Sequence, residues 1–387
     1  MTSFTYIAPC HFGLEAVLKR EIQNIGLEVT AVEDGRVFFK GGPEAAAQAN
    51  VFLRTAERIL LCVGEFKAET FDALFEGTRA LPWEEFIPRD GKCWVTKASS
   101  VRSALFSPSD IQRIMKKAIA TRLGSAYGLS WLPETGASYP VRVSIRKDRV
   151  TVGLDTTGNS LHKRGYRVSP VLAPISETLA AGLIQLTPWR RGRILVDPFC
   201  GSGTIPIEAA MMARHIAPGM KRPFLAETWD GPVTIKDFDT ARKMARQEII
   251  DDPDSDIQGY DIDESAVRFA RDNAKAAGVE DCIHFQKRAV KDLSHPKKYG
   301  FIITNPPYGE RIEDKKNLPQ IYGELGAAYR ALDAWSMYVI SAYEKTPDDI
   351  GTKPSRNRKI YNGMMKTYIY EYIGPKPPRK GPGRSEA

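Results

Sequence analysis

With 387 residues, 42% of them hydrophobic and 26% charged, the chain has the composition of a soluble globular protein and the length of two or three domains. No apolar run approaches the roughly 18 residues of a membrane helix, residues 1–9 show no export signal, and the five cysteines form no Cys-x-x-Cys pair, so we expect a cytoplasmic protein with no metal and no membrane partner. The net charge of +8 is gathered in two stretches, which favours a polyanionic partner and leaves the oligomeric state open.

Residues 1–65 are predicted to form a small α+β domain. Apolar residues at helical spacing predict helices over residues 13–25 and 43–53. Strand patterns occupy residues 4–7, 36–40 and 58–63, and glycine-containing turns bound the second of them.

Residues 66–160 are predicted to form a second α+β unit with a basic surface. Ser109 is the expected N-cap of a basic amphipathic helix over residues 110–123. Residues 99–103, just before this helix, are interpreted as a polar, basic loop that contacts phosphates or only adds solubility. The other expected elements are a helix over 71–80 and strands over 93–98, 139–146 and 149–154.

From residue 178 onward, strands alternate with helices, which indicates an α/β fold with a parallel, doubly wound sheet. This domain is placed at residues 161–374, and the basic, proline-rich residues 375–387 are expected to be a disordered tail. The predicted strands are residues 194–197, 257–261, 284–287, 301–304, 337–341 and a final pair near 359–360 and 367–373.

A glycine-bearing turn follows the first of these strands and leads into a helix. Gly201 and Gly203 allow the backbone to bend tightly and to approach a ligand closely. Asp197, at the end of the strand, can accept hydrogen bonds from an ammonium group. The third glycine of a dinucleotide loop is missing, and so is the Gly-Lys-Ser/Thr of a phosphate-binding loop, which argues against those two classes.

The strand at residues 257–261 also ends in acidic residues. A carboxylate at this position can hold both hydroxyls of a ribose, as it does in NAD-binding proteins. Asp261 is predicted for this role, whereas Asp263 is predicted to cap a helix over residues 264–277. The alternative for Asp261 is an acid that only forms the turn.

The strand at residues 301–304 ends in Asn305-Pro306-Pro307-Tyr308. Methyl transfer to a planar amino group requires that the nitrogen lone pair be freed from conjugation with the ring. The side-chain carbonyl of Asn305 and a proline backbone carbonyl can accept the two amino hydrogens, because the prolines fix φ and remove competing donors. Tyr308 can stack on an extruded base. The motif predicts an amino-methylating enzyme that needs no metal, and a simple turn is the alternative.

Positive charge is concentrated in two stretches of the chain. Residues 91–167 carry 14 lysines and arginines against 4 acidic residues, and residues 351–387 carry 9 against 2. Phosphate contacts dominate nucleic-acid affinity, so this segregation favours a nucleic acid over a merely solvated basic face. The residues predicted to contact RNA are Lys97, Arg102, Arg113, Lys116, Lys117, Lys163, Arg164 and Arg167.

From Tyr6 to about Gly374 the chain resembles the THUMP-domain class I RNA methyltransferases, and within them the N-terminal methyltransferase half of the RlmL-type bacterial 23S rRNA guanine-N2 enzymes. Residues 161–167 resemble the linker after THUMP, 173–180 the element over the methionine end of the cofactor, and 305–311 the catalytic signature.

The resemblance implies a ferredoxin-like domain, then THUMP, then a Rossmann-like methyltransferase domain with a mainly parallel seven-stranded sheet. It implies S-adenosylmethionine as cofactor and N2-methylguanosine in 23S rRNA as product. The cofactor-binding residues that it implies, together with those argued above, are Pro174, Glu177, Asp197, Phe199, Gly201, Ser202, Gly203, Thr204, Asp261, Ile262, Ala289 and Val290.

One position departs from the family pattern. After the third strand an acidic residue is usual beside the adenine, and this chain has Ala289 there. Asp292 is one substitute, and backbone groups alone are the other.

Other functions stay open at the level of sequence. A tRNA guanine is an alternative substrate, because THUMP-bearing relatives act there by recognising an acceptor end. DNA adenine-N6 methyltransferases and the enzymes that methylate a release-factor glutamine share the Asn-Pro-Pro-Tyr corner. However, the former carry a target-recognition domain, and the latter lack a long basic N-terminal region. A non-catalytic RNA-binding or assembly protein is the remaining alternative, and the intact residues 305–308 argue against it.

Overall fold

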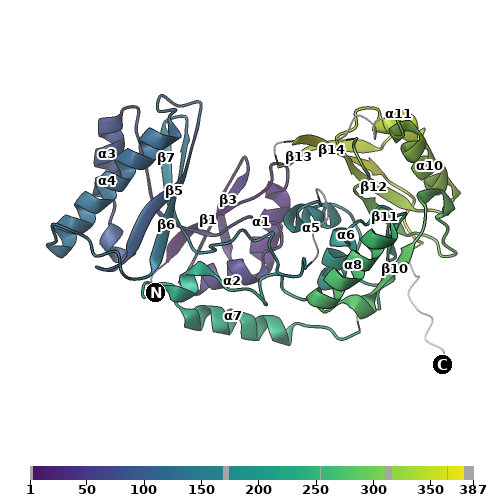
Figure 1. Ribbon diagram of the computed structural model, residues 1–387, viewed down its shortest axis with the longest axis horizontal. Coiled ribbons are helices and arrows are strands. Elements are labelled where there is room, and N and C mark those ends of the chain that lie inside the picture. The colour runs from purple at the N-terminus through teal and green to yellow at the C-terminus, as the bar shows by residue number, and fades with distance from the viewer. Residues whose placement is uncertain (1–2, 169–173, 253, 310–315, 364, 379–387) are drawn as a thin grey trace. The chain divides into compact units, whose positions relative to one another are not determined.

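The structure is a computed structural model that describes residues 3–168, 174–252, 254–309, 316–363 and 365–378. The chain forms two compact units (Figure 1). The first unit comprises Met1–Arg164 with Ala217–Glu248, and the second comprises Gly165–Ile216 with Ile249–Ala387. No helix in the described ranges is long and apolar enough to cross a membrane.

The first unit is built on one seven-stranded sheet in the order β2-β3-β1-β4-β7-β6-β5. Neighbouring strands are antiparallel except β5 and β6, which are parallel. Residues 65 and 66 both lie in β4, so the two predicted α+β domains share this sheet. The strands are β1 (Phe4–Pro9), β2 (Glu28–Glu33), β3 (Arg36–Gly41), β4 (Leu60–Lys67), β5 (Lys92–Val101), β6 (Ser138–Arg146) and β7 (Arg149–Asp155).

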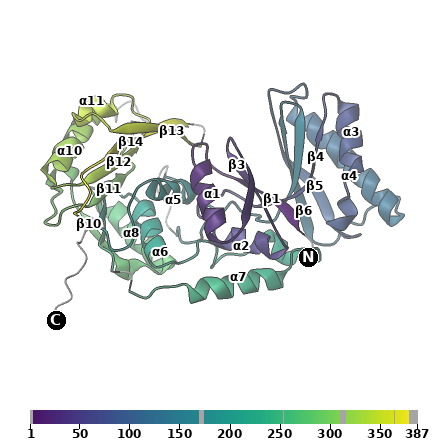
Figure 2. The same ribbon diagram turned by 180° about the vertical axis from the view of Figure 1, so that it is seen from behind.

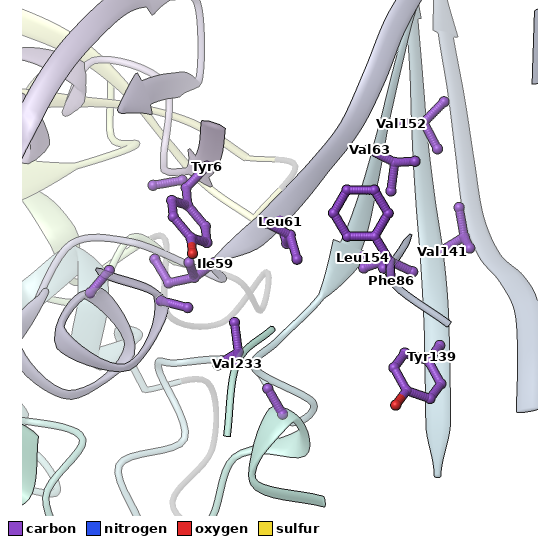
Figure 3. Close-up of a cluster of buried hydrophobic side chains, with 14 of the residues drawn as sticks. Tyr6, Ile59, Leu61, Val63, Phe86, Tyr139, Val141, Val152, Leu154 and Val233 are labelled. Carbon is purple, nitrogen blue, oxygen red and sulfur yellow. The ribbon is translucent and has the colours of Figure 1, made fainter. Parts of the chain in front are cut away.

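Helices pack against one face of this sheet. Alternate strand residues such as Tyr6, Leu61 and Val141 turn toward them and form a large apolar core with Phe86 (Figure 3). The helices of the unit are α1 (Glu15–Asn24), α2 (Glu44–Phe52), α3 (Phe71–Ala80), α4 (Pro108–Tyr127) and α7 (Ile235–Gln247). On the other face, Ile7, Phe38 and Leu60 form a small apolar cluster of strand residues only.

Residues 217–248 pack into the first unit although the chain on both sides of them belongs to the second. Phe238 of α7 is buried in the first core and stacks on Phe224, with ring centroids 5.2 Å apart. Trp229 stacks on Tyr139 at 4.8 Å, and its Nε1 donates to the Ser138 carbonyl at 2.8 Å. The packing of residues 217–248 in the first unit was not predicted. An amphipathic pattern shows that a helix buries one face, but it does not show which part of the molecule that face contacts.

Several predicted element boundaries in the first unit were wrong. Residues 99–101 are the end of β5 and not a loop, because their backbone pairs with residues 144–146 of β6. The N-cap of α4 is Ser107, whose hydroxyl accepts from the Asp110 amide, and the helix runs on to Tyr127. Strand β2 was missed, because its side chains are mostly exposed and show no apolar alternation.

The second unit has a seven-stranded sheet in the order β10-β9-β8-β11-β12-β14-β13. The first five strands are parallel, and the final hairpin is antiparallel, with β14 pairing to β12. The predicted class I methyltransferase sheet is confirmed. Its strands are β8 (Leu195–Asp197), β9 (Ile257–Asp261), β10 (Ile283–Lys287), β11 (Phe301–Thr304), β12 (Ser336–Ser341), β13 (Arg356–Asn362) and β14 (Met365–Tyr372).

Two layers of helices cover this sheet (Figures 1 and 2). Tyr322 and Leu325 of the α10 layer pack on Val196 and Ile302 of the strands. The α5 layer contains α5 (Glu177–Gln185), α6 (Thr204–Ala213) and α8 (Glu264–Ala277), and the α10 layer contains α10 (Leu318–Ala331) and α11 (Thr346–Ile350). The predicted disordered tail lies mostly outside the described residues.

Candidate active site

The residues predicted to bind a cofactor gather at the carboxyl edge of the second sheet, around a cavity of about 610 Å³. Strand β8 ends at this edge and lies between β9 and β11 in the sheet. The strand order reverses at this point, where open α/β sheets bind their ligands. The predicted site residues in the lining are Pro174, Asp197, Phe199, Gly201, Ser202, Thr204, Asp261, Ile262, Ala289, Val290, Asn305, Pro306, Pro307 and Tyr308.

The turn after β8 requires its two glycines for different reasons. Gly201 has φ +50° and lines the cavity, whereas Gly203 has φ +82° and forms the N-cap of α6. A Cβ on Gly203 would lie 3.0 Å from the Cβ of Ala270 and 3.1 Å from the Phe285 ring. Gly203 therefore lets the helix pack closely, and Gly201 lets the backbone approach a ligand.

Asp261 joins this turn to the end of β9. One carboxylate oxygen accepts from the Gly201 amide at 3.0 Å, and the other accepts from the Asp263 amide at 3.0 Å. An ionised carboxylate offers about four acceptor positions, so the group still fits two ribose hydroxyls. The side chain of Asp263 accepts from the Ser265 amide at 2.8 Å, which confirms its predicted role as the cap of α8.

Asp197 is almost completely buried at the end of β8, with 1% of its surface exposed. Its Oδ1 accepts from the Thr304 hydroxyl at 2.6 Å and from the Phe199 amide at 3.1 Å. Burial raises the pKa of this carboxyl to about 7, with the two hydrogen bonds acting in the opposite direction. A cationic ammonium group in the cavity would favour the ionised form, which fits the predicted role.

The Asn-Pro-Pro-Tyr corner follows β11 directly and lines the same cavity. The Tyr308 hydroxyl donates to Oδ1 of Asn305, so the tyrosine holds the acceptor that an incoming amino group would need. The backbone carbonyl of Pro307 is already taken, because it accepts from the Tyr322 hydroxyl at 3.2 Å. The carbonyl of Pro306 is therefore the better second acceptor for an amino group.

Tyr322 supports the Asn-Pro-Pro-Tyr corner through its hydrogen bond to Pro307, and this role was not predicted from the sequence. It is fully buried on α10, and its hydroxyl also lies 2.7 Å from the hydroxyl of Ser341 at the end of β12. The Thr346 hydroxyl donates to Ser341 at 3.0 Å, so three buried hydroxyls form a chain that ends on Pro307. Burial raises the pKa of Tyr322, which keeps its hydroxyl protonated and able to donate.

Glu177 lies outside the cavity lining and holds Arg167. The guanidinium of Arg167 donates to the Glu177 carboxylate at 3.1 and 2.9 Å and to the hydroxyls of Ser202 and Thr204 at 3.0 and 3.2 Å. Arg167 was predicted to contact RNA, yet all these bonds end on the cofactor turn and on the helix next to it. It therefore supports the turn.

The part of the cavity where the adenine is predicted to lie has apolar residues in its wall. Ala289 and Val290 line it, and Ile262 exposes 71% of its surface there. Asp292, the suggested acidic substitute, is exposed and does not belong to the lining. The position of Asp292 therefore does not support it as the substitute for the missing acid, which favours the alternative that backbone groups would hold the adenine.

Several residues of the cavity wall were not among the predicted site residues, and Arg288, Ile321 and Glu324 are three of them. Arg288 stacks on Tyr260 at 5.2 Å and donates to the Ser294 hydroxyl at 2.8 Å, which holds it at the wall. Ile321 and Glu324 come from α10, whose position over the sheet edge no local pattern reveals. Residues 310–311 of the signature lie outside the described residues.

The residues predicted to contact RNA differ in their surroundings. Arg164 is 4% exposed and donates to the backbone carbonyls of Leu161 and Arg54, so its guanidinium is used inside the first unit. Arg113 pairs with Asp110 at 2.9 Å on an exposed helix face. Those on the surface are Lys97, Arg102, Arg113, Lys116, Lys117 and Lys163.

Lys97 is the predicted RNA contact with the most informative position. It lies on the face of the first sheet that carries no helix of that unit, where it lines a concavity of about 180 Å³. Arg36, Arg142 and Arg146 line the same concavity from β3 and β6. These four residues, the basic sheet face, unite cations from both predicted N-terminal domains.

The fold and the cavity together define a class. The sheet order, the glycine turn between two strand-end acids and the amino-methylation corner around one cavity are those of a class I methyltransferase. Within the described ranges, no three His, Cys, Asp or Glu side chains lie together as a metal site would require.

Family comparison gives a narrower assignment. Residues 164–371 match the RMKL-like methyltransferase domain, residues 5–60 the RlmL ferredoxin-like domain, and residues 68–155 the THUMP domain. The chain belongs to the RMKL-like methyltransferase family and carries both N-terminal domains of that arrangement.

Two curated relatives have informative names. YpsC of Bacillus subtilis (strain 168), named as a supposed RNA methyltransferase, is 45% identical over 96% of both chains. A ribosomal RNA large subunit methyltransferase K/L of Syntrophotalea carbinolica is 31% identical over 95% of this chain. This chain spans 53% of the length of that K/L protein, and about half of the other K/L relatives.

Two solved structures share the whole architecture. SMU.472, described as a supposed methyltransferase in complex with SAH, is 40% identical with a TM-score of 0.91 over 98% of this chain and 100% of its own. A Listeria monocytogenes protein described as an expected N6-adenine-specific DNA methylase is 44% identical, with a TM-score of 0.91 over 97% of both chains. SAH is what remains of S-adenosylmethionine after methyl transfer, so the cofactor of this family member is S-adenosylmethionine.

Proposed function

We propose that this protein methylates RNA and forms N2-methylguanosine in 23S rRNA. The corner at Asn305 and Pro306, two residues that line the cofactor cavity and offer carbonyl acceptors, carries the amino-methylation part of the proposal. The resemblance to the 23S rRNA guanine-N2 enzymes supplies guanine as the target. A guanine N2 amino group has two hydrogens for these acceptors. The THUMP domain, the basic sheet face and the relatives named for ribosomal RNA support RNA as the substrate.

In the proposed reaction S-adenosylmethionine supplies an electrophilic methyl group. Asp261 would hold the ribose of the cofactor and Asp197 its ammonium group, because both carboxylates line the cavity. Asn305 Oδ1 and the Pro306 carbonyl would accept the amino hydrogens and aim the nitrogen lone pair at the methyl group. Asn305 Oδ1 has two lone pairs, so it can accept an amino hydrogen besides the bond from the Tyr308 hydroxyl, and the Tyr308 ring would stack on the extruded guanine.

The test is nucleoside mass spectrometry of 23S rRNA and tRNA from cells with and without the gene. The proposal predicts that N2-methylguanosine falls by one site per 23S rRNA and returns when the gene is restored. Loss from tRNA alone would move the substrate to tRNA. An unchanged content in both pools would contradict the proposal.

The DNA adenine alternative is tested with the same cells, because the Listeria structure is named for that activity. If N6-methyladenine disappeared from DNA while both RNA pools stayed unchanged, the enzyme would be a DNA methyltransferase. If the role is non-catalytic, a gene that encodes Asn305→Ala should rescue the deletion strain as well as the natural gene does.

A further inference from the structure

The antiparallel hairpin β13–β14 extends past the carboxyl edge of the second sheet. Tyr368 of β14 is paired with Ser341, the last residue of β12, so residues 365–367 have no partner on β12. In the same stretch β14 pairs only with residues 360–362 of β13. Figure 1 shows these two strands at the end of the sheet beyond β12.

This end of the hairpin lies at the same edge as the catalytic corner. Strands β11 and β12 are parallel, and Thr304 is paired with Val339, two residues before the end of β12. Asn305 follows Thr304 directly. The free end of the hairpin therefore projects on the side of the sheet where the cofactor cavity opens.

Lysine and tyrosine alternate on one face of this projecting end. Lys359 is paired with Tyr368, and Tyr361 with Lys366, so the four side chains stand on the same face in a two-by-two pattern. Each ammonium lies over the ring two residues along its own strand, at 5.1 Å for Lys359 on Tyr361 and at 5.1 Å for Lys366 on Tyr368. These four residues are called the lysine–tyrosine face.

The opposite face of the hairpin anchors it. Ile360 and Thr367 are buried, and the buried Glu371 accepts from Arg356 and Arg358 at 2.6 Å each. Those two arginines are therefore occupied by an internal carboxylate.

The two lysines of the lysine–tyrosine face are in a different position. Both are exposed, and neither lies within ion-pair distance of a carboxylate in the described part of the chain. The pKa of Lys366 is raised, chiefly by its hydrogen bond to the Tyr368 hydroxyl and least by the charge of Glu344. The outer end of the hairpin thus combines aromatic rings with cations that have no carboxylate partner in the described part of the chain.

We propose that the lysine–tyrosine face binds the RNA strand next to the target nucleotide, an inference that rests on the proposed RNA methyltransferase function. Surfaces for single-stranded nucleic acid combine cations that follow the phosphates with rings on which bases stack. The target base must leave its stack to reach the corner, so its neighbours pass the edge as an open strand. Lys359 and Lys366 contact their phosphates, and the ring of Tyr361 stacks on a base, whereas Tyr368 packs partly against the core of the α10 layer.

The experiment uses the full-length protein and 23S rRNA isolated from cells that lack the gene. The Lys359→Ala/Lys366→Ala variant is compared with the natural protein for methyl transfer and for RNA binding at several salt concentrations. We expect the KM for RNA to rise about tenfold, and the slope of log affinity against log salt to fall by about 1.4, since each lost contact to a single strand accounts for about 0.7. S-adenosylmethionine affinity should not change.

The matched control is Lys275→Ala/Lys298→Ala, which removes the same charge at the opposite edge. Lys275 is in the last turn of α8 and Lys298 precedes β11, so both lie on the amino-terminal side of the strands. A Lys359→Arg/Lys366→Arg variant keeps the charge and should retain RNA binding, which separates lost contacts from a distorted hairpin.

The outcomes distinguish a failure of the proposal for the lysine–tyrosine face from a failure of the proposed function. If the natural protein methylates RNA and the alanine variant matches the control in KM and salt slope, the lysine–tyrosine face is not an RNA surface. If the arginine variant loses as much as the alanine variant at unchanged S-adenosylmethionine affinity, the charge argument is wrong. If the natural protein methylates neither rRNA nor tRNA, it is the proposed function that fails.

Discussion

The two sheets of this molecule have the same number of strands and use them differently. The first sheet has its helices on one face, and on the other face Arg36, Lys97, Arg142 and Arg146 line a concavity, where Arg36 pairs with Glu33 and Arg142 with Asp155. The second sheet is covered on both faces, so its polar residues appear at the carboxyl edge, around a cavity. An open face suits a long polyanion, and an edge suits a small cofactor and one reacting group.

Because the two sheets carry different sites, RNA binding and methyl transfer should be separable by substitution. Substitutions of residues that line the cofactor cavity should change methyl transfer or cofactor affinity and leave RNA binding intact, whereas substitutions on the basic sheet face should do the reverse.

The largest effect is expected at the corner. Asn305→Ala removes an acceptor that the amino group needs as it reacts, so kcat should fall about 10²- to 10³-fold, as when one preorganised hydrogen-bonding group is removed from an active site. S-adenosylmethionine affinity, measured by calorimetry, should stay within twofold. A variant that keeps half of the natural kcat would contradict the assignment of the corner.

The next effect concerns the cofactor itself. Asp261→Ala removes the carboxylate that holds the Gly201 amide and is proposed to hold the ribose. Hydrogen bonds to a charged group are worth about 1.5–3 kcal/mol, so S-adenosylmethionine affinity should fall about 10- to 100-fold. Asp263→Ala serves as the control, because that residue only caps α8. Equal losses in the two variants would mean that Asp261 acts only on the fold.

A pH dependence should arise from Asp197. Its pKa is raised to about 7 by burial, and binding of an ammonium group favours the ionised form. Below pH 7 binding must therefore displace a proton, so S-adenosylmethionine affinity should drop up to about tenfold per pH unit, and it should level off above pH 7. Calorimetry between pH 6 and 8 measures this dependence. Asp197→Asn should bind weakly with a flat profile, and an unchanged slope in that variant would refute the assignment.

A smaller effect is expected from the buried hydroxyl behind the corner. Tyr322→Phe removes the donor to the Pro307 carbonyl. Such a bond contributes about 1 kcal/mol, so kcat should fall about fivefold, while KM and S-adenosylmethionine affinity stay unchanged. Tyr372→Phe is the matched control, because Tyr372 lies in the same core and its hydroxyl has no partner among the described residues. A similar loss in both variants would point to general packing.

The smallest effect is expected on the basic sheet face. Lys97→Ala removes one of its four cations, so RNA affinity should fall a few-fold and the salt slope by about 0.7–0.9. kcat and S-adenosylmethionine affinity should not change. Lys19→Ala, on the exposed side of α1, provides the control. If Lys97→Ala lowered kcat instead, the inference that the basic sheet face binds RNA and takes no part in methyl transfer would be wrong.

Sequence reasoning succeeded where the signal is local. The strand ends at Asp197, Asp261 and Asn305 could be predicted, because short apolar runs followed by turn residues mark the carboxyl ends of buried strands. Parallel strands then bring these ends to one edge without further information. The same local rules predict that Asp263 caps α8 and leave Asp261 as the candidate for the ribose.

The sequence could not reveal which distant groups would meet. Nothing local shows that the guanidinium of Arg167 donates to Glu177 and to the cofactor turn. The excursion of residues 217–248 into the first unit depends on the fit of Trp229 against Tyr139, which is a tertiary property. Tyr322 was passed over for the same reason, because a tyrosine in an amphipathic helix gives no sign of what its hydroxyl touches.

The most direct test is methyl transfer in vitro to 23S rRNA taken from cells that lack the gene. Natural protein and Asn305→Ala are incubated with isotopically labelled S-adenosylmethionine, and the digested nucleosides are separated by mass. The account predicts label in N2-methylguanosine with the natural protein and none above background with the variant. Label in another nucleoside, or equal label with both proteins, would contradict it.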